Sequence, residues 1–247
     1  FFKRALIAAP VALGGAIAEA AFVEPEWLNV QRIKLGNRGR KFVQFTDVHY
    51  RGDAAYLKRV VEVINSHAPE LVFFTGDLVE EAIHFGPALE IIKQVKAPMY
   101  GIPGNHDFWA EADFDLAREV FAAQGGRWLM DEDITLDKQT KIFGVTGGRA
   151  PKFELQDDGL NLLLSHYPDW WKRIEKTRFD LILSGHSHGG QVRLPGIGSV
   201  LTPSRCGEFE MGLYQTGAGP MYVNPGIGYF YANVRFCCRP EVTVFDI

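Results

Sequence analysis

The stretch LVFFTGD, residues 71–77, is an apolar run of four residues that ends in a threonine, a glycine and an aspartate. A continuous apolar run without alternation is typical of a strand that is covered on both faces, as in α/β proteins. In open α/β sheets the binding site lies beyond the carboxyl ends of the strands. We therefore expect a buried strand here, with Asp77 at its functional end.

The same order of strand, polar loop and helix recurs on both sides of this stretch. KFVQFTD (41–47) alternates and ends in polar residues, and residues 54–67 follow it with an apolar face at helical spacing. That face consists of Leu57, Val60, Val61 and Ile64. A third strand is expected within 97–107, followed by a helix around 111–124. The apolar face of this helix consists of Phe114, Ala117 and Phe121.

The second half of the chain contains further apolar runs, separated by glycine and proline turns. The strands expected there are 141–148, 160–166, 180–186, 191–201, 219–226 and 241–247. A short helix-like stretch, 168–177, separates two of them. The pattern indicates an α/β sandwich with sheets inside and helices outside.

The composition is that of a globular protein and excludes some classes of function. Of the 247 residues, 47% are hydrophobic, and the formal net charge of -4 provides no general basic face for nucleic acid. The three cysteines contain no CxxC spacing, so neither a thiolate zinc site nor a disulfide framework is indicated. We expect one domain, residues 23–247, that is a monomer and binds no nucleic acid.

Residues 1–22 differ from the rest of the chain. Two basic residues precede an apolar run that is shorter than the roughly 20 residues of a membrane span, and small residues follow it. This order is similar to that of an export signal, and the initial FFK resembles the sequence after the arginine pair of a twin-arginine signal. We expect an export signal or membrane anchor, and a bacterial protein that is exported or associated with a membrane at either face. The alternative is an amphipathic helix on the surface of the domain.

Polar residues with ligand chemistry follow five of the expected strands. These residues are Asp47, His49, Asp77, Asn105, His166, His186 and His188. Carboxylates, an amide oxygen and imidazoles without sulfur suit Mn, Fe, Zn or Co better than calcium or a thiolate zinc site. There are enough ligands for two divalent ions, of which Mn is the one we expect to support activity in an assay.

Two adjacent ions explain the doublet GHSH at 185–188, because each imidazole then has its own target. Asp77 has two carboxylate oxygens and can bridge ions that lie roughly 3.5–4 Å apart. A hydroxide shared between such ions becomes a nucleophile near neutral pH.

These motifs, in this order, resemble those of the calcineurin-like metallophosphoesterases. The family pattern is D-x-H, G-D, G-N-H-D/E, H and G-H-x-H, and the chain matches each from about residue 41 onward. The resemblance implies a four-layer α/β/β/α sandwich of two mixed β-sheets flanked by helices. It also implies two divalent metal ions and a phosphate-ester or pyrophosphate substrate.

The resemblance assigns roles to individual residues. The implied ligands of the first ion are Asp47, His49, Asp77 and His188. Those of the second ion are Asp77, Asn105, His166 and His186. The implied catalytic residues are His106, which would lie over the phosphate, and Asp107, which would orient the ring of His106.

A branch of the family is also indicated. The stretches at 184–198 and 222–247 resemble the exported or membrane-associated bacterial members, except that Ser187 replaces the usual threonine at a non-ligand position. That branch includes phosphoesterases preceded by twin-arginine signals. It also includes the pyrophosphatases that cut UDP-2,3-diacylglucosamine in lipid A synthesis.

Residues for substrate recognition are less well defined. The segment 226–236 is rich in aromatic residues and is either core packing, an apolar wall for an acyl chain or a stacking platform for a base. Arginines in the tail would hold a phosphate or form surface ion pairs. The candidate substrate contacts are Tyr50, Arg51, Trp109 and Arg235.

The sequence therefore predicts a metal-dependent hydrolase that cuts a phosphodiester or pyrophosphate by in-line attack of a metal-bridging hydroxide. The substrate is expected to be membrane-proximal, such as UDP-2,3-diacylglucosamine. The alternatives are a generic phosphodiesterase or phosphomonoesterase for small soluble substrates and a non-catalytic, metal-organised scaffold. The complete set of ligands favours an enzyme.

Overall fold

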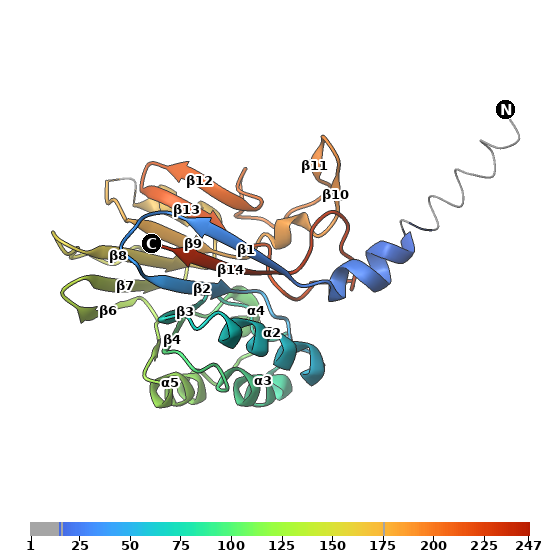
Figure 1. Ribbon diagram of the computed structural model, residues 1–247, viewed down its shortest axis with the longest axis horizontal. Helices are drawn as coiled ribbons and strands as arrows, with labels where there is room; N and C mark the ends of the chain where they lie inside the picture. Colours follow the sequence, from blue (N-terminus) through green and yellow to red (C-terminus); the bar gives the residue numbers. More distant parts are fainter. Residues whose placement is uncertain (1–14, 16, 175) are drawn as a thin grey trace, which may run out of the picture.

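Two six-stranded sheets lie face to face in the computed structural model, which describes residues 15, 17–174 and 176–247 (Figure 1). The first sheet has the order β1-β14-β2-β3-β4-β5, and its neighbours are parallel except for the pair β14 and β2. Its strands are β1 (Asn29–Lys34), β2 (Lys41–Phe45), β3 (Leu71–Phe74), β4 (Met99–Gly101), β5 (Arg127–Trp128) and β14 (Glu241–Asp246).

The second sheet has the order β12-β13-β9-β8-β7-β6, with antiparallel pairs at its two edges and parallel strands between them. Its strands are β6 (Glu132–Asp137), β7 (Thr140–Val145), β8 (Leu160–Ser165), β9 (Leu181–Ser184), β12 (Gly212–Thr216) and β13 (Gly219–Val223). A separate antiparallel hairpin consists of β10 (Arg193–Leu194) and β11 (Gly198–Ser199), and it projects at the upper right of Figure 1.

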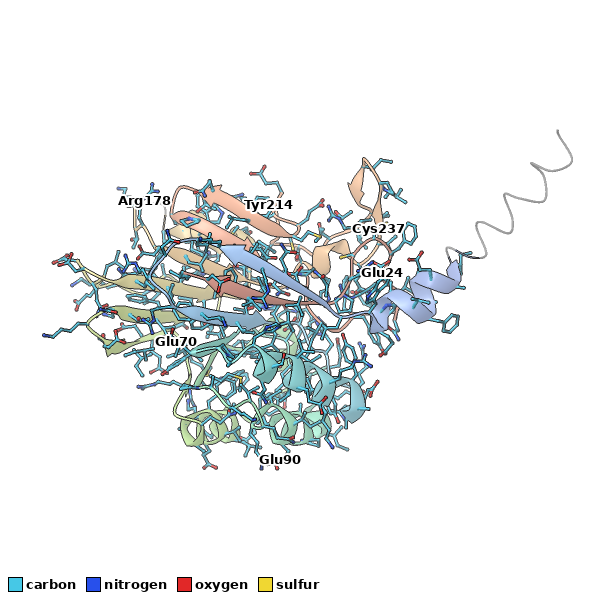
Figure 2. The ribbon with its side chains drawn as sticks, viewed as in Figure 1. Glu24, Glu70, Glu90, Arg178, Tyr214 and Cys237 are labelled. Atoms are coloured by element: carbon cyan, nitrogen blue, oxygen red, sulfur yellow. The ribbon has the colours of Figure 1, made fainter. Side chains whose placement is uncertain are left out.

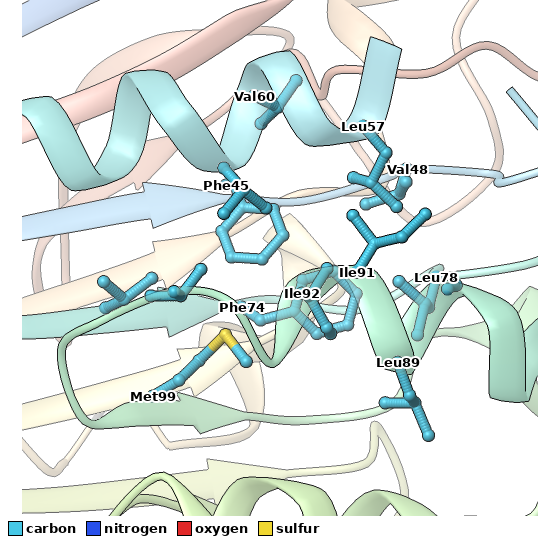
Figure 3. Close-up of a cluster of buried hydrophobic side chains, with 14 of the residues drawn as sticks. Phe45, Val48, Leu57, Val60, Phe74, Leu78, Leu89, Ile91, Ile92 and Met99 are labelled. Atoms are coloured by element: carbon cyan, nitrogen blue, oxygen red, sulfur yellow. The ribbon is translucent and has the colours of Figure 1, made fainter. Parts of the chain in front are cut away.

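Helices cover the outer face of the first sheet. These helices are α2 (Ala54–Ser66), α3 (Phe85–Ile92) and α5 (Phe114–Ala123). Asp53 caps α2 by accepting a hydrogen bond from the backbone N–H of Tyr56, as expected for an aspartate at this position. Figure 3 shows Leu57 and Val60 of α2 directed toward Phe45 of β2. The apolar face that the sequence predicts for α2 is therefore the buried one.

Three buried hydrophobic clusters fill three spaces between layers. One lies between the helices and the first sheet, the second between the two sheets, and the third outside the second sheet. In β8, Leu162 and Leu164 belong to the cluster between the sheets, whereas Leu163 belongs to the outer one. This alternation explains the unbroken apolar run, because both faces of the strand are covered. The chain thus forms the expected sandwich of two mixed sheets flanked by helices.

The outermost layer over the second sheet is thinner than the α-helical one. It contains the 3-10 helix η4 (Pro168–Arg173), which is shorter than the helix expected at 168–177. Trp170 is fully buried in this layer and its indole N–H donates to the carbonyl of Gly148 at 3.1 Å. The side chain of Trp170 therefore helps to anchor the short helix to the sheet.

The first described residues dock on the C-terminal loop. The π-helical turn η1 (Glu19–Val23) and the 3-10 turn η2 (Glu24–Glu26) precede β1. Glu24 is buried and its carboxylate accepts the backbone N–H groups of Cys237, at 2.9 Å, and of Cys238. Figure 2 shows Glu24 and Cys237 side by side. Most of the expected signal or anchor at 1–22 lies outside the described residues, and within them no helix is long and apolar enough to span a membrane.

Candidate metal centre

The loops that follow β2, β3, β4, β8 and β9 meet at one edge of the sandwich. The backbone N–H groups of Val48 and His49 both donate to the carbonyl of Asp77, at 2.8 and 3.1 Å, which joins the first two loops. The backbone N–H of His186 donates to the carboxylate of Asp47 at 2.9 Å, which connects the loop after β9 to the loop after β2. All seven ligands expected from the sequence lie here, and none is more than 7% exposed.

Five of these seven residues have a left-handed backbone. They are Asp47, His49, Asp77, His186 and His188, with φ between 44° and 67°. Such a conformation costs a residue other than glycine on the order of 1–3 kcal/mol and persists only where the surroundings fix it. Strain of this kind gathers at functional sites. The fold therefore holds these side chains in place against the local preference of the backbone.

A first cluster of ligand atoms consists of Asp47, His49 and His188. The Nε2 atoms of the two histidines lie 2.9 Å apart. Asp47 Oδ1 lies 3.4 Å from Nε2 of His188 and 3.9 Å from Nε2 of His49. Three ligand atoms from two loops thus surround one point.

A second cluster consists of Asp77, His166 and His186, with Asn105 beside it. His166 Nε2 lies 3.1 Å from Nδ1 of His186 and 3.1 Å from Oδ1 of Asn105. Asp77 Oδ2 lies 3.2 Å from Nε2 of His166 and 3.7 Å from Nε2 of His49 in the first cluster. One carboxylate oxygen therefore faces both clusters, as a bridging ligand would.

The hydrogen bonds of His166 and His186 direct one nitrogen of each ring toward the other, and this arrangement favours a cation between them. His166 Nδ1 lies 2.7 Å from the carbonyl of Thr75, and His186 Nε2 lies 2.8 Å from the carbonyl of Ser204. A carbonyl can only accept, so each of these two ring nitrogens carries a proton, and in the neutral rings the nitrogens that face each other have lone pairs. Opposed lone pairs 3.1 Å apart repel unless a proton or a metal ion lies between them. The donor set therefore fits a divalent ion.

The pKa values of the rings show the same competition for a cation. Burial alone would lower the pKa of His166, but the carboxylate of Asp77 raises it to about 9. Burial and the neighbouring His166 lower the pKa of His186 to about 4. In the first cluster burial would lower the pKa of His49, but the carboxylates beside it raise it to about 9. In each cluster the carboxylates thus favour a positive charge among the ring nitrogens, which is the charge that a metal ion would supply.

Glu80 contacts two of the expected site residues, although no motif in the sequence points to it. Its Oε1 lies 2.5 Å from Nδ1 of His49, and its Oε2 lies 2.9 Å from Nδ1 of His106. Burial tends to raise the pKa of Glu80, but the hydrogen bonds to the two imidazoles hold it well below the usual range. Its position three residues after Asp77 is the only signal in the sequence. A single carboxylate therefore orients one expected ligand and one expected catalytic ring.

The expected pairing of Asp107 with the ring of His106 is wrong. The carboxylate of Asp107 is fully buried and accepts four backbone N–H groups instead. These donors are Gly104 (2.9 Å), Asp77 (2.9 Å), Leu78 (2.8 Å) and Val79 (3.2 Å). Both residues lie on the short helix α4 (Asn105–Trp109), where adjacent side chains point in different directions. Asp107 thus fixes the loop that carries Asp77, and Glu80 contacts the ring.

The expected role of Arg235 at the substrate phosphate is also wrong. Arg235 is fully buried, and its guanidinium donates to carbonyls of the loop around it. The accepting carbonyls are those of Pro225, Gly226, Gly228 and Cys238. A guanidinium with these partners has no donor left for a ligand. Arg235 therefore stabilises the loop that follows β13.

The other candidate contacts divide between two cavities. Trp109 is 71% exposed, and its ring centroid lies 4.7 Å from that of His106, at the rim of a cavity of about 270 Å³. Asp77, Asn105, His186 and His188 also line this cavity. Tyr50 and Arg51 line a separate cavity of about 100 Å³, in which Arg51 contacts Glu80 at 3.2 Å. Only Trp109 of the four thus lines the cavity over the metal ligands.

A calcineurin-like phosphoesterase family model matches residues 40–190, which is more than half of the chain. The chain belongs to the calcineurin-like phosphoesterase family. It is accordingly a hydrolase that acts on phosphate esters.

Curated relatives match along almost the whole chain. Bacillus subtilis (strain 168) has a similar protein named "Uncharacterized metallophosphoesterase YkuE", with 30% identity over 98% of this chain and 93% of the relative. The phosphodiesterase YaeI of Escherichia coli (strain K12) is 25% identical over 97% of this chain and 96% of its own. The UDP-2,3-diacylglucosamine pyrophosphatase LpxG of Chlamydia trachomatis (serovar D) is 24% identical over 90% of both.

A solved structure supports the fold. The crystal structure of TT1561 of Thermus thermophilus aligns with a TM-score of 0.53 at 12% identity. The alignment covers 76% of this chain and 90% of that one. The arrangement of the layers is therefore shared with a distant protein.

Proposed function

We propose that this chain hydrolyses a phosphodiester or pyrophosphate bond at a centre of two divalent ions, with Mn, Zn, Fe or Co as the candidate metals. The observation that carries the proposal is the position of Asp77 Oδ2, which lies 3.2 Å from His166 Nε2 and 3.7 Å from His49 Nε2. Asp47, His49 and His188 would hold one ion. Asn105, His166 and His186 would hold the other, with Asp77 between them.

Two bound ions would supply Lewis acidity at the phosphoryl oxygens and would lower the pKa of a water molecule beside the phosphorus. The protein would supply orientation. The buried ligands, on loops fixed by hydrogen bonds, would keep the phosphate at one place in the cavity of about 270 Å³.

His106 is suited to act on the leaving oxygen. It lines the same cavity, and Glu80 accepts from its Nδ1 at 2.9 Å. The carboxylate therefore keeps the proton on Nδ1 and leaves Nε2 for the substrate. A protonated ring in this position would donate from Nε2 to the oxygen that departs from phosphorus.

The activity is tested with bis-p-nitrophenyl phosphate and Mn. We expect turnover that depends on the metal, and a His106→Ala variant that turns over at least about 100-fold more slowly while its metal content stays near that of the parent. Asp77→Ala should lose metal as well as activity. Absence of turnover with every divalent ion, on protein shown to hold metal, would overturn the proposal.

For the substrate we propose a membrane-proximal molecule such as UDP-2,3-diacylglucosamine. Support comes from the similarity to a pyrophosphatase for that compound and from apolar residues at the cavity, Leu201, Phe230 and Tyr231. The second candidate is a small soluble diester, favoured by the similarity to a phosphodiesterase. Comparing kcat/KM for both on one preparation separates them, because the first proposal requires the higher value for the lipid.

We propose further that residues 1–22 act as an export signal or membrane anchor and that the protein is exported or membrane-associated. The apolar composition of the segment supports this. Cell fractionation and mass spectrometry of the native N-terminus test it. An intact N-terminus on protein found only in the soluble cytosolic fraction would overturn it.

A further inference from the structure

An apolar groove of about 300 Å³ lies beside the cavity over the metal ligands. Its apolar lining includes Val192, Val200, Leu201, Phe230, Tyr231 and Val234. Leu201, Phe230 and Tyr231 line both the groove and the cavity, so the two spaces are adjacent. Among the described residues, no charged side chain lines the groove. A molecule whose phosphate lies at the ligand clusters would thus meet only uncharged surface in this direction.

The side chains at the groove are exposed although they are large and apolar. Val200 is 61% exposed, Leu201 is 65% exposed and Tyr231 is 91% exposed. A contiguous apolar surface of this kind usually marks a binding site, because its exposure to water is unfavourable. Within the part of the chain that the structure describes, no segment covers these residues.

One wall of the groove is the hairpin of β10 and β11 together with the residues that follow it. Gly190, with φ of +78°, allows the hairpin to approach, since a Cβ at this position would lie 2.3 Å from Cβ of Ser199. Arg193 donates to Glu210 at 2.7 Å, and the hydroxyl of Ser199 donates to the same carboxylate. The backbone N–H of Val200 donates to the carbonyl of Val192 at 3.0 Å. These hydrogen bonds therefore hold the hairpin in place while its apolar side chains stay exposed to solvent.

The other wall is the loop 230–234, which the side chain of Gln191 holds. Gln191 Oε1 accepts from the backbone N–H of Phe230 at 2.9 Å. Its Nε2 donates to the carbonyls of Ala232, at 3.1 Å, and Val234, at 2.9 Å. Three hydrogen bonds from one buried side chain thus define this wall. Because Gln191 follows His188 by three residues, one turn builds both the metal cluster and the groove.

We infer that the groove binds an apolar chain that is covalently attached to the substrate's phosphate. The inference rests on the proposed function and deepens it, since it assigns the substrate class to lipid-like phosphate esters. The three lining residues that the groove shares with the cavity favour this occupant over a second copy of the chain or a flat membrane surface. A membrane would engage the tip of the hairpin, where Ile197 is 78% exposed, as strongly as the groove.

Alkyl p-nitrophenyl phosphodiesters with methyl, butyl and octyl chains test the inference. Water adds to phosphorus, p-nitrophenolate leaves with the bond electrons, and an alkyl phosphate and a proton remain, so the chemistry is the same in each. Full burial of one methylene group would raise kcat/KM about fourfold. An open groove, which covers only one side of the chain, would raise it about twofold per methylene. We therefore expect kcat/KM to rise about 16-fold from butyl to octyl, below the micelle concentration.

Two matched variants locate the effect. Val200→Ser should reduce the octyl-to-methyl ratio of kcat/KM by about threefold or more, because it removes apolar wall from the groove. Ile197→Ser, on the same hairpin but outside the groove, should keep the ratio of the parent. The melting temperature of both variants serves as the control for folding.

The outcomes are distinguishable. Turnover of the methyl ester with a kcat/KM that does not depend on chain length would overturn the inference and leave the proposed function intact. An equal fall of the octyl-to-methyl ratio in Val200→Ser and Ile197→Ser would also overturn it, and would indicate that the chain associates with the hairpin surface in general. Concentration-dependent dimerisation that Val200→Ser abolishes would overturn it as well and assign the groove to a second copy. No turnover of any ester by metal-loaded protein would overturn both proposals.

Discussion

Replacing Asp107 by asparagine tests whether this carboxylate supports the loop of Asp77 or serves the ring of His106. Each oxygen of Asp107 accepts two backbone N–H groups at 2.8–3.2 Å. Asparagine would place an NH2 group at one of the two oxygen positions. There it would face two backbone N–H donors and could accept no hydrogen bond from either. Hydrogen bonds to a charged group contribute roughly 1.5–3 kcal/mol each, so losing two costs about 3–6 kcal/mol. That is a large fraction of the roughly 5–15 kcal/mol by which a domain is typically stable.

The assay is thermal unfolding together with metal content at pH 8. Burial and the nearby Asp77 raise the pKa of Asp107 to about 7, whereas the four N–H groups favour the charged form, so the carboxylate is ionised at this pH. A change of 1 kcal/mol shifts the melting temperature of a chain of this size by about 2–4 °C, so Asp107→Asn should lower it by about 6–24 °C. Metal content should fall with it. A variant that melts with the parent and loses only turnover would refute this reasoning and restore the pairing with His106.

Three further changes probe other parts of the site. Glu80→Gln removes the carboxylate between His49 and His106 and should lower kcat/KM for bis-p-nitrophenyl phosphate about 10–100-fold. The control is Glu81→Gln, at an exposed neighbouring position, which should leave kcat/KM unchanged. A loss below about threefold in Glu80→Gln would contradict the role of Glu80. The pKa values of His49 and His166 are raised from 6.5 to about 9, so the stability that they contribute to metal-free protein is present below pH 6.5 and is lost as the pH rises through 9. The melting temperature of chelator-treated protein should therefore fall over this range and that of Mn-loaded protein should not; parallel curves would count against the assignment. Gly185→Ala would place a Cβ 2.3 Å from Oδ2 of Asp47 and should reduce the bound metal, whereas Gly148→Ala, with open space around it, should not; full occupancy in both variants would argue against Asp47 as a ligand.

Strongly patterned elements were predictable from the sequence. The helix α2 and the strands β2, β3, β8 and β9 carry apolar residues at the spacing that each element requires. The edge strands β1 and β6 could not be predicted from the sequence. β6 (EDITLD) has no fully buried residue, and β1 (NVQRIK) has none either, so neither shows a marked apolar run. The helix α3 begins FGP, and a proline close to its start hides the helical pattern.

The ligand set could be predicted because its motifs are local, whereas the supporting contacts could not. Asp107 follows His106 in the chain, yet a helix turns adjacent side chains apart. Glu80 precedes His106 by 26 residues and reaches it only through the fold. Arg235 resembles a phosphate ligand in sequence, but its partners are carbonyls that the loop supplies after folding. Contacts of this kind depend on tertiary structure and leave no mark on local spacing.

The most direct test is elemental analysis of the Mn-loaded protein combined with anomalous diffraction from its crystals. The account predicts two ions per chain, one in contact with Asp47, His49 and His188 and the other with Asn105, His166 and His186, with Asp77 in contact with both. A single ion between Glu80, His49 and His106, or clusters that hold no ion in protein saturated with Mn, would contradict it.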